Sequence, residues 1–193
     1  MKPNIVPQSN EAQFSIFLRI KHPTLDPADI SRSLGLEPED MRKAGLDVSK
    51  TGQRRLHSES YWVAQLPNSA LMDEVLRALK TESSSKEKLR ALNEVTTGLT
   101  SSRVQDFAFF KSVFGNEVWA ELQDSSWHDL ALYHWLNKLS QHRDFFSTIR
   151  RDKGSVTILL QLPERARPFR IRSLIARYVA DMGVELEIDW AEG

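Results

Sequence analysis

Apolar residues recur at every second position near both ends of the chain, and this predicts a strand at each end. The pattern covers residues 13–21 and residues 184–190. Period two is typical of a strand that buries one face. The inward-facing residues are then Phe14, Ile16, Leu18, Ile20, Val184, Leu186, Ile188 and Trp190. Residues 155–162, "SVTILLQL", and residues 60–66, "SYWVAQL", predict two further strands of the same sheet.

A short helix between these strands carries its own start and stop signals. Asp26 is a suitable N-cap, and Pro27 takes the first helical position, where its missing N–H costs nothing. Gly35 can adopt the left-handed conformation that ends a helix. Because so short a helix is marginal alone, we expect it to dock Ile30 and Leu34 on the sheet, as a structural element rather than a site of chemistry.

Apolar residues at helical spacing predict two longer helices. One is amphipathic and begins at about Ser126, and the other runs from Pro168 to Gly183. The core contacts expected from the first are Leu130, Leu136, Leu139, Phe146 and Ile149, and those from the second are Ile171, Leu174, Ile175, Tyr178 and Val179. The other predicted elements are helices near residues 69–80 and 84–98 and a strand at 117–123.

Two segments have no clear periodicity. Residues 37–60 are polar and predict a long loop, which in a compact protein is mobile or functional. Residues 103–116 fit either a strand or a helix. The surface that meets other molecules is therefore expected near residues 37–60.

These elements predict an α+β protein with an antiparallel or mixed sheet and helices packed on one face, in a ferredoxin-like arrangement. We expect residues 1–12 to be a flexible tail and residues 13–193 to form a single domain. A weak similarity between residues 61–79 and 118–136 leaves a second interpretation open. In that interpretation the domain consists of two related halves, residues 13–100 and 103–193.

Composition narrows the classes of function. The 193 residues include 26 basic and 26 acidic ones, so no net charge attracts nucleic acid or an anionic membrane. The absence of cysteine excludes disulfides, thiolate nucleophiles and cysteine-bound metals, and suits a reducing compartment. No stretch approaches the roughly 18 apolar residues of a membrane span. We therefore expect a cytoplasmic protein that contacts neither membrane nor nucleic acid.

Several residues together resemble a known family. They are Leu25, Asp26, Pro27, Ile30, Leu34, Gly35, Pro38 and Gly45, then a tryptophan strand, and at the end "GVELEIDW". Over residues 13–66 and 117–190 the chain resembles the bacterial domain-of-unknown-function family 4279, with Trp62 or Trp119 as the family tryptophan and additional sequence around 67–116. The resemblance implies a small α+β domain and brings no settled activity or catalytic residues.

No motif for catalysis, a metal or a cofactor is found in the sequence. The histidines lack the i, i+4 spacing of a helical metal site, and neither a nucleophile elbow nor a glycine-rich phosphate loop occurs. Glu185, Glu187 and Asp189 share one strand face, and we interpret them as a solvated surface. No cofactor is therefore expected, and an enzyme is less favoured than a binding protein.

The candidate binding residues are aromatic and basic, as is common at protein interfaces. They are Arg54, Arg55, His57, Trp62, Trp119, Trp127, Arg170 and Arg177. The sequence thus favours a non-enzymatic protein-binding module, with an immunity or antitoxin-type protein as a specific hypothesis. Two alternatives stay open: a small-molecule binder or hydrolase-type enzyme with a pocket under residues 37–60, and a homodimer that assembles through its own surface.

Overall fold

The structure is a computed structural model, and it describes residues 14–48, 54–67, 127–163 and 169–191. Its main feature is a five-stranded sheet in the order β2-β5-β1-β6-β7. The strands are β1 Ser15–His22, β2 Asp40–Arg42, β5 Ser60–Gln65, β6 Ser155–Pro163 and β7 Glu185–Ala191. All neighbouring pairs are antiparallel except β6 and β7, which are parallel. The two ends of the chain therefore share one mixed sheet.

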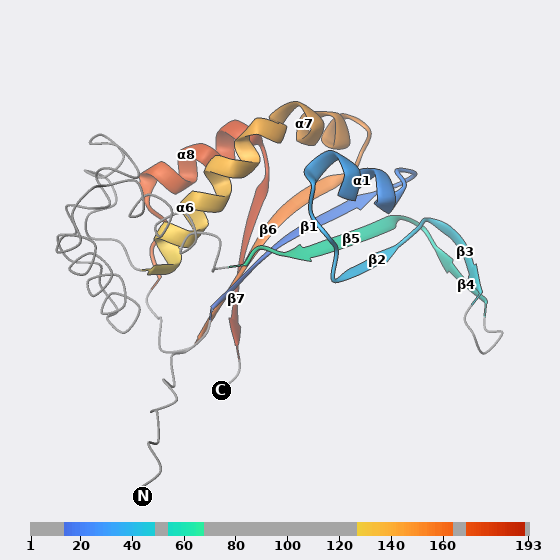
Figure 1. Cartoon of the computed structure of the whole chain (residues 1–193), viewed down its shortest axis with the longest axis horizontal. Helices are drawn as coiled ribbons and strands as arrows, with labels where there is room; N and C mark the ends of the chain where they lie inside the picture. The colour runs from blue at the N-terminus through green and yellow to red at the C-terminus, as the bar shows by residue number, and fades with distance from the viewer. Residues whose placement is uncertain (1–13, 49–53, 68–126, 164–168, 192–193) are drawn as a thin grey trace, which may run out of the picture.

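Helices cover one face of this sheet (Figure 1). They are α1 Pro27–Leu34, α6 Trp127–Leu139, α7 Arg143–Arg151 and α8 Ser173–Met182. The prediction of an α+β fold with a mixed sheet and helices on one face is confirmed. The opposite face of the sheet is not covered by any described helix, and this open face becomes important for the candidate site.

β1 is the central strand, and it follows the predicted alternation. Ile16, Leu18 and Ile20 are completely buried on the helix side, whereas the residues between them are half-buried on the open face. β1 pairs with β5 on one side and with β6 on the other. Because both neighbours pair with its backbone N–H and C=O groups, β1 can lie at the centre of the sheet without unpaired backbone polar groups.

α1 begins and ends where its sequence signals predict. The Asp26 side chain accepts a hydrogen bond from the Ala28 backbone N–H at 3.0 Å. Gly35 adopts a left-handed conformation with φ of 65°, and its N–H donates to the Ser31 carbonyl at 2.8 Å. Ile30 and Leu34 are buried as expected. The capped ends thus hold a two-turn helix against β5.

The predicted helix from residue 126 is two helices. A 3₁₀ turn, Ser140–His142, separates α6 from α7. The expected core residues Leu130, Leu136, Leu139, Phe146 and Ile149 are all buried. The prediction of an amphipathic helix with one apolar face is correct for α7 but wrong for α6, because every residue of α6 from Asp129 to Leu136 is buried. α6 packs against α8 as well as above the sheet, and its sequence "LALYHWL" is apolar almost throughout.

The C-terminal β–α–β unit has a shorter helix than predicted. α8 begins at Ser173 rather than Pro168, because Arg172 has an extended backbone with ψ of 147°. Ile171 therefore lies outside the helix and is 48% exposed, which corrects its assignment to the core. Leu174 and Ile175 are buried as predicted. The helix ends at Gly183 with φ of 61°, as its sequence indicated.

The ferredoxin-like arrangement and the duplication are not confirmed. A ferredoxin-like unit is a split β–α–β, in which another strand lies between the two parallel strands. Here β6 and β7 are direct neighbours. The predicted tail at 1–12, the helices near 69–80 and 84–98, the undecided residues 103–116 and the strand at 117–123 lie outside the described residues.

His128 predicts a pH dependence of folding. The ring of His128 lies 6.0 Å from the Phe14 ring and 5.2 Å from the Phe169 ring, between centroids. Burial lowers the pKa of His128 below 6.5, while the Asp129 carboxylate acts in the opposite direction. The unfolded chain therefore binds a proton more readily than the folded one just below pH 6.5. We expect the free energy of unfolding to fall as the pH drops from about 7.5 to about 5.

Urea denaturation at these two pH values measures this effect. His128→Gln should show a smaller fall than the wild type, because glutamine does not titrate. Burial also lowers the pKa of His142, so His142→Gln is needed as a parallel variant to separate the two contributions. An unchanged pH dependence in His128→Gln would show that the histidine titrates alike in both states.

Candidate functional site

The segment 37–60, predicted as a loop, contains three strands. β2 is the edge strand of the five-stranded sheet, and β3 Gly45–Val48 pairs with β4 Arg54–His57 in a separate two-stranded sheet. The loop prediction was wrong because these strands are three or four residues long and mostly polar, so no period stands out. We call β3 and β4 together the arm. It projects past the end of the sheet beside β2 (Figure 1).

The arm is joined to the sheet by specific contacts at its base. The backbone N–H of Ala44 donates to the hydroxyl of Ser60 at 2.9 Å, and Ser60 is fully buried. Just before the arm, Lys43 Nζ lies 2.6 Å from Asp26 Oδ2. The hydrogen bond between them lowers the pKa of Asp26 and raises the pKa of Lys43. These contacts connect the base of the arm to β5 and to the N-cap of α1.

A depression of about 270 Å³ lies where the arm meets the open face of the sheet. It is lined by Lys21, Arg42, Leu56, His57, Ser58, Glu59 and Tyr61. All of these residues are exposed or half-buried, so the depression is shallow and open to solvent. It lies at the place where the sequence suggested a pocket, but most of its lining comes from strands, and only Ser58 and Glu59 come from the bend between β4 and β5.

Strand pairing explains why the lining residues come together. Arg42 of β2 is directly opposite Tyr61 of β5, and Tyr61 is directly opposite Lys21 of β1. Directly paired residues of antiparallel strands have their side chains on the same face. The three side chains therefore form a row across the open face, on the side away from the helices.

The charged groups in this row have specific partners. The Arg42 guanidinium carbon lies 4.6 Å from the centre of the Tyr61 ring, which is a cation–π contact. Arg42 also lies 3.8 Å from Asp40, and Lys21 Nζ lies 3.5 Å from Glu59 Oε1. Exposed ion pairs of this length are weak in water. The positive groups can thus exchange these partners for an incoming anion at little cost.

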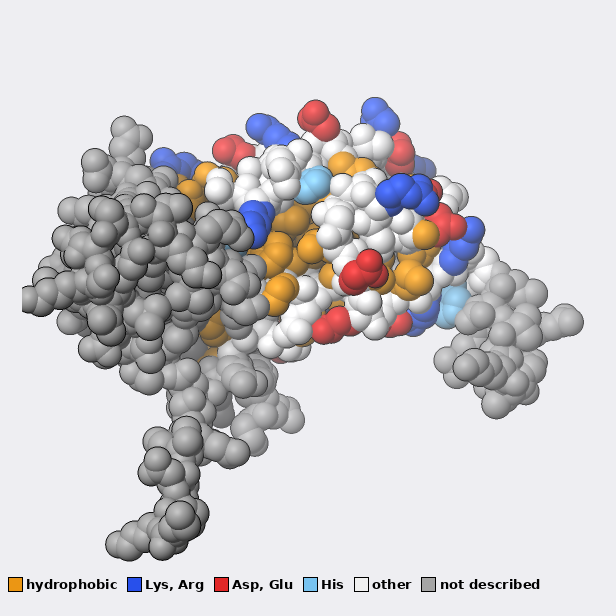
Figure 2. All heavy atoms as spheres, in the orientation of Figure 1, with side chains coloured by type: hydrophobic (Ala, Val, Ile, Leu, Met, Phe, Trp, Pro, Cys, Tyr) orange, Lys and Arg blue, Asp and Glu red, His pale blue; other side chains and the backbone are white. Residues whose placement is uncertain are grey.

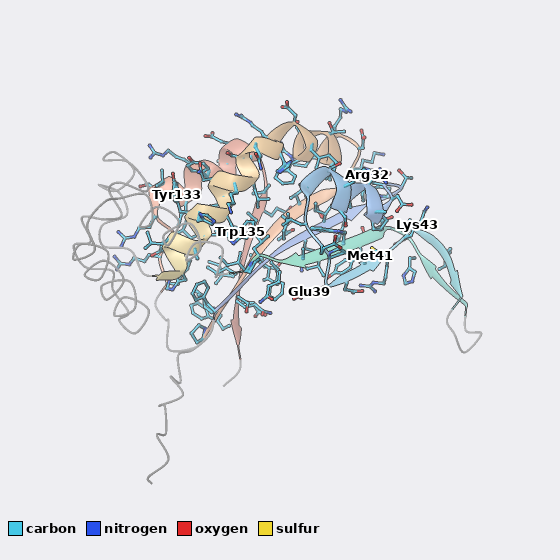
Figure 3. All side chains as sticks on the ribbon, viewed as in Figure 1. Arg32, Glu39, Met41, Lys43, Tyr133 and Trp135 are labelled. Atoms are coloured by element: carbon cyan, nitrogen blue, oxygen red, sulfur yellow. The ribbon has the colours of Figure 1, made fainter. Side chains whose placement is uncertain are left out.

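One exposed apolar residue lies beside the depression. Leu56 on the arm lines the depression and is 80% exposed. Met41 on β2 is 53% exposed, but it is paired with Trp62, so its side chain is on the helix side of the sheet, away from the depression. In Figure 3 Met41 and Lys43 are near the base of the arm, far from Trp135 of α6. Single exposed apolar residues are ordinary, but Leu56 belongs to a polar depression. Together the arm, β2 and the depression make the candidate site.

The candidate site has a small excess of basic residues. The arm, β2, Lys43 and the depression together contain five basic residues and three acidic ones. The basic residues are Lys21, Arg42, Lys43, Arg54 and Arg55, and the acidic residues are Asp40, Asp47 and Glu59. The whole chain has equal numbers of basic and acidic residues. Figure 2 shows blue and red side chains intermixed over the face it presents, rather than a large surface of one sign.

Trp62 belongs to the core and is not a binding residue. It is completely buried on the helix side of β5, and its indole Nε1–H donates to the hydroxyl of Ser31 at 2.9 Å. Because successive side chains of a strand point to opposite faces, Trp62 and Tyr61 are on different faces of the sheet, and Tyr61 lies on the open face. The sequence could not decide which face of the strand is covered, and this correction comes from the position of α1.

The other predicted binding residues do not form one surface. Arg54 and Arg55 lie on β4, in register with Val48 and Asp47, and His57 lines the depression. Trp127 is the first residue of α6, and Trp119 lies outside the described residues. Arg177 in α8 and Arg170 before it are exposed at the opposite end of the molecule (Figure 1). Only the three residues of β4 belong to the candidate site.

The acidic residues of β7 form the solvated surface that the sequence predicted. Glu185, Glu187 and Asp189 are exposed. Arg19 makes an ion pair with Glu187, and Thr157 donates a hydrogen bond to Glu185 at 3.2 Å. Among the described residues no group of three or more histidine, aspartate or glutamate side chains is arranged to hold a metal ion. Within the same residues, no helix has the length and apolar character of a membrane span.

Lys21, Arg42 and Tyr61 were missed by the sequence analysis. A signal for Lys21 existed, because it occupies an outward position of the alternating strand at 13–21. Tyr61 could likewise be placed on the face opposite Trp62. Their convergence with Arg42 could not be found, because it depends on the pairing of β2 with β5, and β2 has only three residues.

Comparison with known proteins gives one match. A family model described as "Domain of unknown function (DUF4279)" matches residues 12–103, a segment that includes β1, α1, β2, the arm and β5. The predicted resemblance is confirmed over this segment, whereas the match does not extend to residues 117–190. Neither the curated proteins nor the solved structures gave a match.

Proposed function

We propose that the protein is a non-enzymatic protein-binding module, from the premise that residues 12–103 match the DUF4279 family, whose description assigns no activity. The candidate site lies within this family segment. The finer proposal is a bacterial immunity or antitoxin-type protein that neutralises a toxin in the cytoplasm. Small α+β folds serve many functions, so the fold alone supports this version only by analogy.

The observation that carries the proposal is the exposed arm. A two-stranded ribbon is only marginally stable in water unless a third strand or a helix packs against it. Among the described residues, β3 and β4 pair with each other and with no strand of the main sheet. Leu56 on this ribbon is 80% exposed. A partner protein that packs against the arm would bury this side chain and stabilise the ribbon.

The shape of the depression also supports a protein partner. Pockets for small molecules are concave, mostly apolar and bury most of the ligand. The depression here is shallow and is lined mainly by polar side chains. Its alternative role, as the site of a small-molecule binder or hydrolase-type enzyme, is supported by the proximity of His57, Glu59 and Lys21. That alternative predicts saturable binding of a small molecule by the isolated protein.

Leu56→Asp is expected to abolish capture of the partner. An aspartate in an apolar contact loses the buried methyl groups and introduces a charge that must be desolvated. We expect affinity for the partner to fall by about tenfold or more. Immobilised wild type and Leu56→Asp are incubated in parallel with lysate of the native host, and the retained proteins are compared by mass spectrometry. The partner is then purified and its dissociation constant measured with both variants.

Ile171→Asp is the matched control, because Ile171 is also an exposed apolar residue but lies far from the arm. A protein retained by the wild type and Ile171→Asp and lost by Leu56→Asp supports the proposal. Equal retention by all three variants, or no specific protein at all, contradicts it. The finer proposal requires in addition that the partner is toxic when expressed alone and harmless when this protein is co-expressed.

A further inference from the structure

We infer that the depression receives a carboxylate group from an acidic segment of the partner protein. This inference rests on the proposed function and deepens it by naming the chemistry of the partner. The first support is the row of Arg42, Tyr61 and Lys21, which strand pairing brings side by side on the open face. The row offers an anion three donor groups, the guanidinium of Arg42, the hydroxyl of Tyr61 and the ammonium of Lys21.

The stacking of Arg42 prepares it for a carboxylate. The guanidinium lies 4.6 Å from the centre of the Tyr61 ring, so the aromatic face restricts its position. A stacked guanidinium keeps its in-plane N–H groups available, and these match the two oxygens of a carboxylate. Its ion pair with Asp40 is long, at 3.8 Å, and about half of each side chain is exposed. An incoming carboxylate can therefore bind Arg42 without first breaking a strong pair.

Lys21 completes the site on the other side of Tyr61. Its Nζ lies 3.5 Å from Glu59 Oε1, and both side chains are more than one third exposed. Ser58 and His57 line the same depression and are further candidates to hold the anion. The depression, with a volume of about 270 Å³, has room for one carboxylate side chain and parts of the residues next to it in the partner.

The negative residues at the site favour an acidic protein over nucleic acid. Glu59 and Asp40 lie beside the two cations. A single carboxylate can avoid them, whereas a continuous row of phosphates would be repelled by both. The exposed Leu56 nearby also suits the mixed apolar and acidic surface of a protein.

A fluorescein-labelled ten-residue peptide, in which a single glutamate is flanked by leucine, serine and glycine residues, provides a direct probe, with binding to the full chain followed by fluorescence anisotropy. We expect Arg42→Gln and Lys21→Gln each to weaken binding by about two- to fivefold, the upper part of the range for an exposed charge pair. Glu59→Gln should strengthen binding, since it removes a repelling carboxylate. Arg143→Gln removes an exposed positive charge from α7 and should leave the affinity unchanged. Circular dichroism confirms that each variant is folded.

Three outcomes would overturn the inference. The first is that Arg42→Gln and Lys21→Gln bind the peptide as well as the wild type. The second is that Arg143→Gln weakens binding as much as they do, which would show attraction by general charge only. The third is that a ten-nucleotide single-stranded DNA binds more tightly than the peptide and depends on the same residues. If the peptide test fails while Leu56→Asp still loses the partner, the proposal of a protein-binding module is retained, and only the inference that the partner is recognised through a carboxylate group is wrong.

Discussion

Replacement of Trp62 by alanine is expected to reduce the free energy of unfolding by about 3–5 kcal/mol, the usual cost of removing a large aromatic side chain from a core. Trp62 is completely buried between β5 and α1. Its removal leaves a cavity at the place where the helix is held on the sheet. Urea denaturation followed by circular dichroism measures the change from the midpoint and the slope.

Two milder variants separate the contributions of Trp62. Trp62→Phe keeps most of the apolar ring but removes the N–H that donates to Ser31, and Ser31→Ala removes the acceptor instead. Each should cost about 1–2 kcal/mol, because a single buried hydrogen bond contributes about that much. If Trp62 were instead an exposed residue that contacts a partner, alanine would cost less than about 0.5 kcal/mol, and that result would contradict the structure.

Gly154→Ala is expected to destabilise the protein by about 2–3 kcal/mol, in the range of overpacked cores. Gly154 lies between the end of α7 and the start of β6. A Cβ at this position would be 2.6 Å from the Lys21 carbonyl oxygen, 2.7 Å from Ile149 Cγ2 and 2.8 Å from His22 Cδ2. These atoms belong to a central strand and a buried side chain, so they cannot move aside easily.

Gly35→Ala is the matched control for Gly154→Ala. Gly35 has φ of 65° and nothing within 4 Å of an added Cβ, so its replacement introduces only backbone strain. We expect a cost of about 1 kcal/mol for it. Comparison of the two urea midpoints isolates the effect of crowding at Gly154. Equal costs for both variants would contradict the close approach of Gly154 to Lys21, Ile149 and His22.

These two stability predictions also bear on the candidate site. Lys21 lines the depression, and its backbone carbonyl is the atom closest to a Cβ at Gly154. Trp62 is next to Tyr61, which carries the stacked Arg42. The buried side chains of β1 and β5 therefore fix the position of the side chains on the open face of the same strands. Substitutions in the core are expected to weaken binding at the arm as well as to lower the stability of the fold.

Capping residues predicted the ends of helices correctly where the end depends on neighbouring residues alone. Asp26 marks the start of α1 and Gly35 marks its end, and Gly183 marks the end of α8. These ends could be predicted because capping depends only on neighbouring residues. The start of α8 was predicted too early, since no capping residue marks it and the apolar spacing continues to Ile171 in the preceding segment. Periodicity cannot tell a helical residue from an extended one that happens to keep the spacing.

The candidate site was predicted only in part. His57, Arg54 and Arg55 are on the arm, as the sequence suggested for residues 37–60. Trp62 was assigned to the binding surface because tryptophan is common at interfaces, yet a strand has two faces and the sequence does not say which one a helix covers. Arg170 and Arg177 share a charge with the arm but lie at the opposite end of the molecule.

The sequence by itself determined the alternation of β1 and β7, the capped ends of α1 and the absence of cysteine, because each depends on residues close together in the chain or on composition alone. Only the tertiary structure decided the strand order, the pairing of β2 with β5 and the meeting of Lys21, Tyr61 and Arg42. Those three residues are separated by up to 40 positions in sequence, since their numbers run from 21 to 61. Hydrogen bonds between strands bring them together, and no local pattern records which strands will pair.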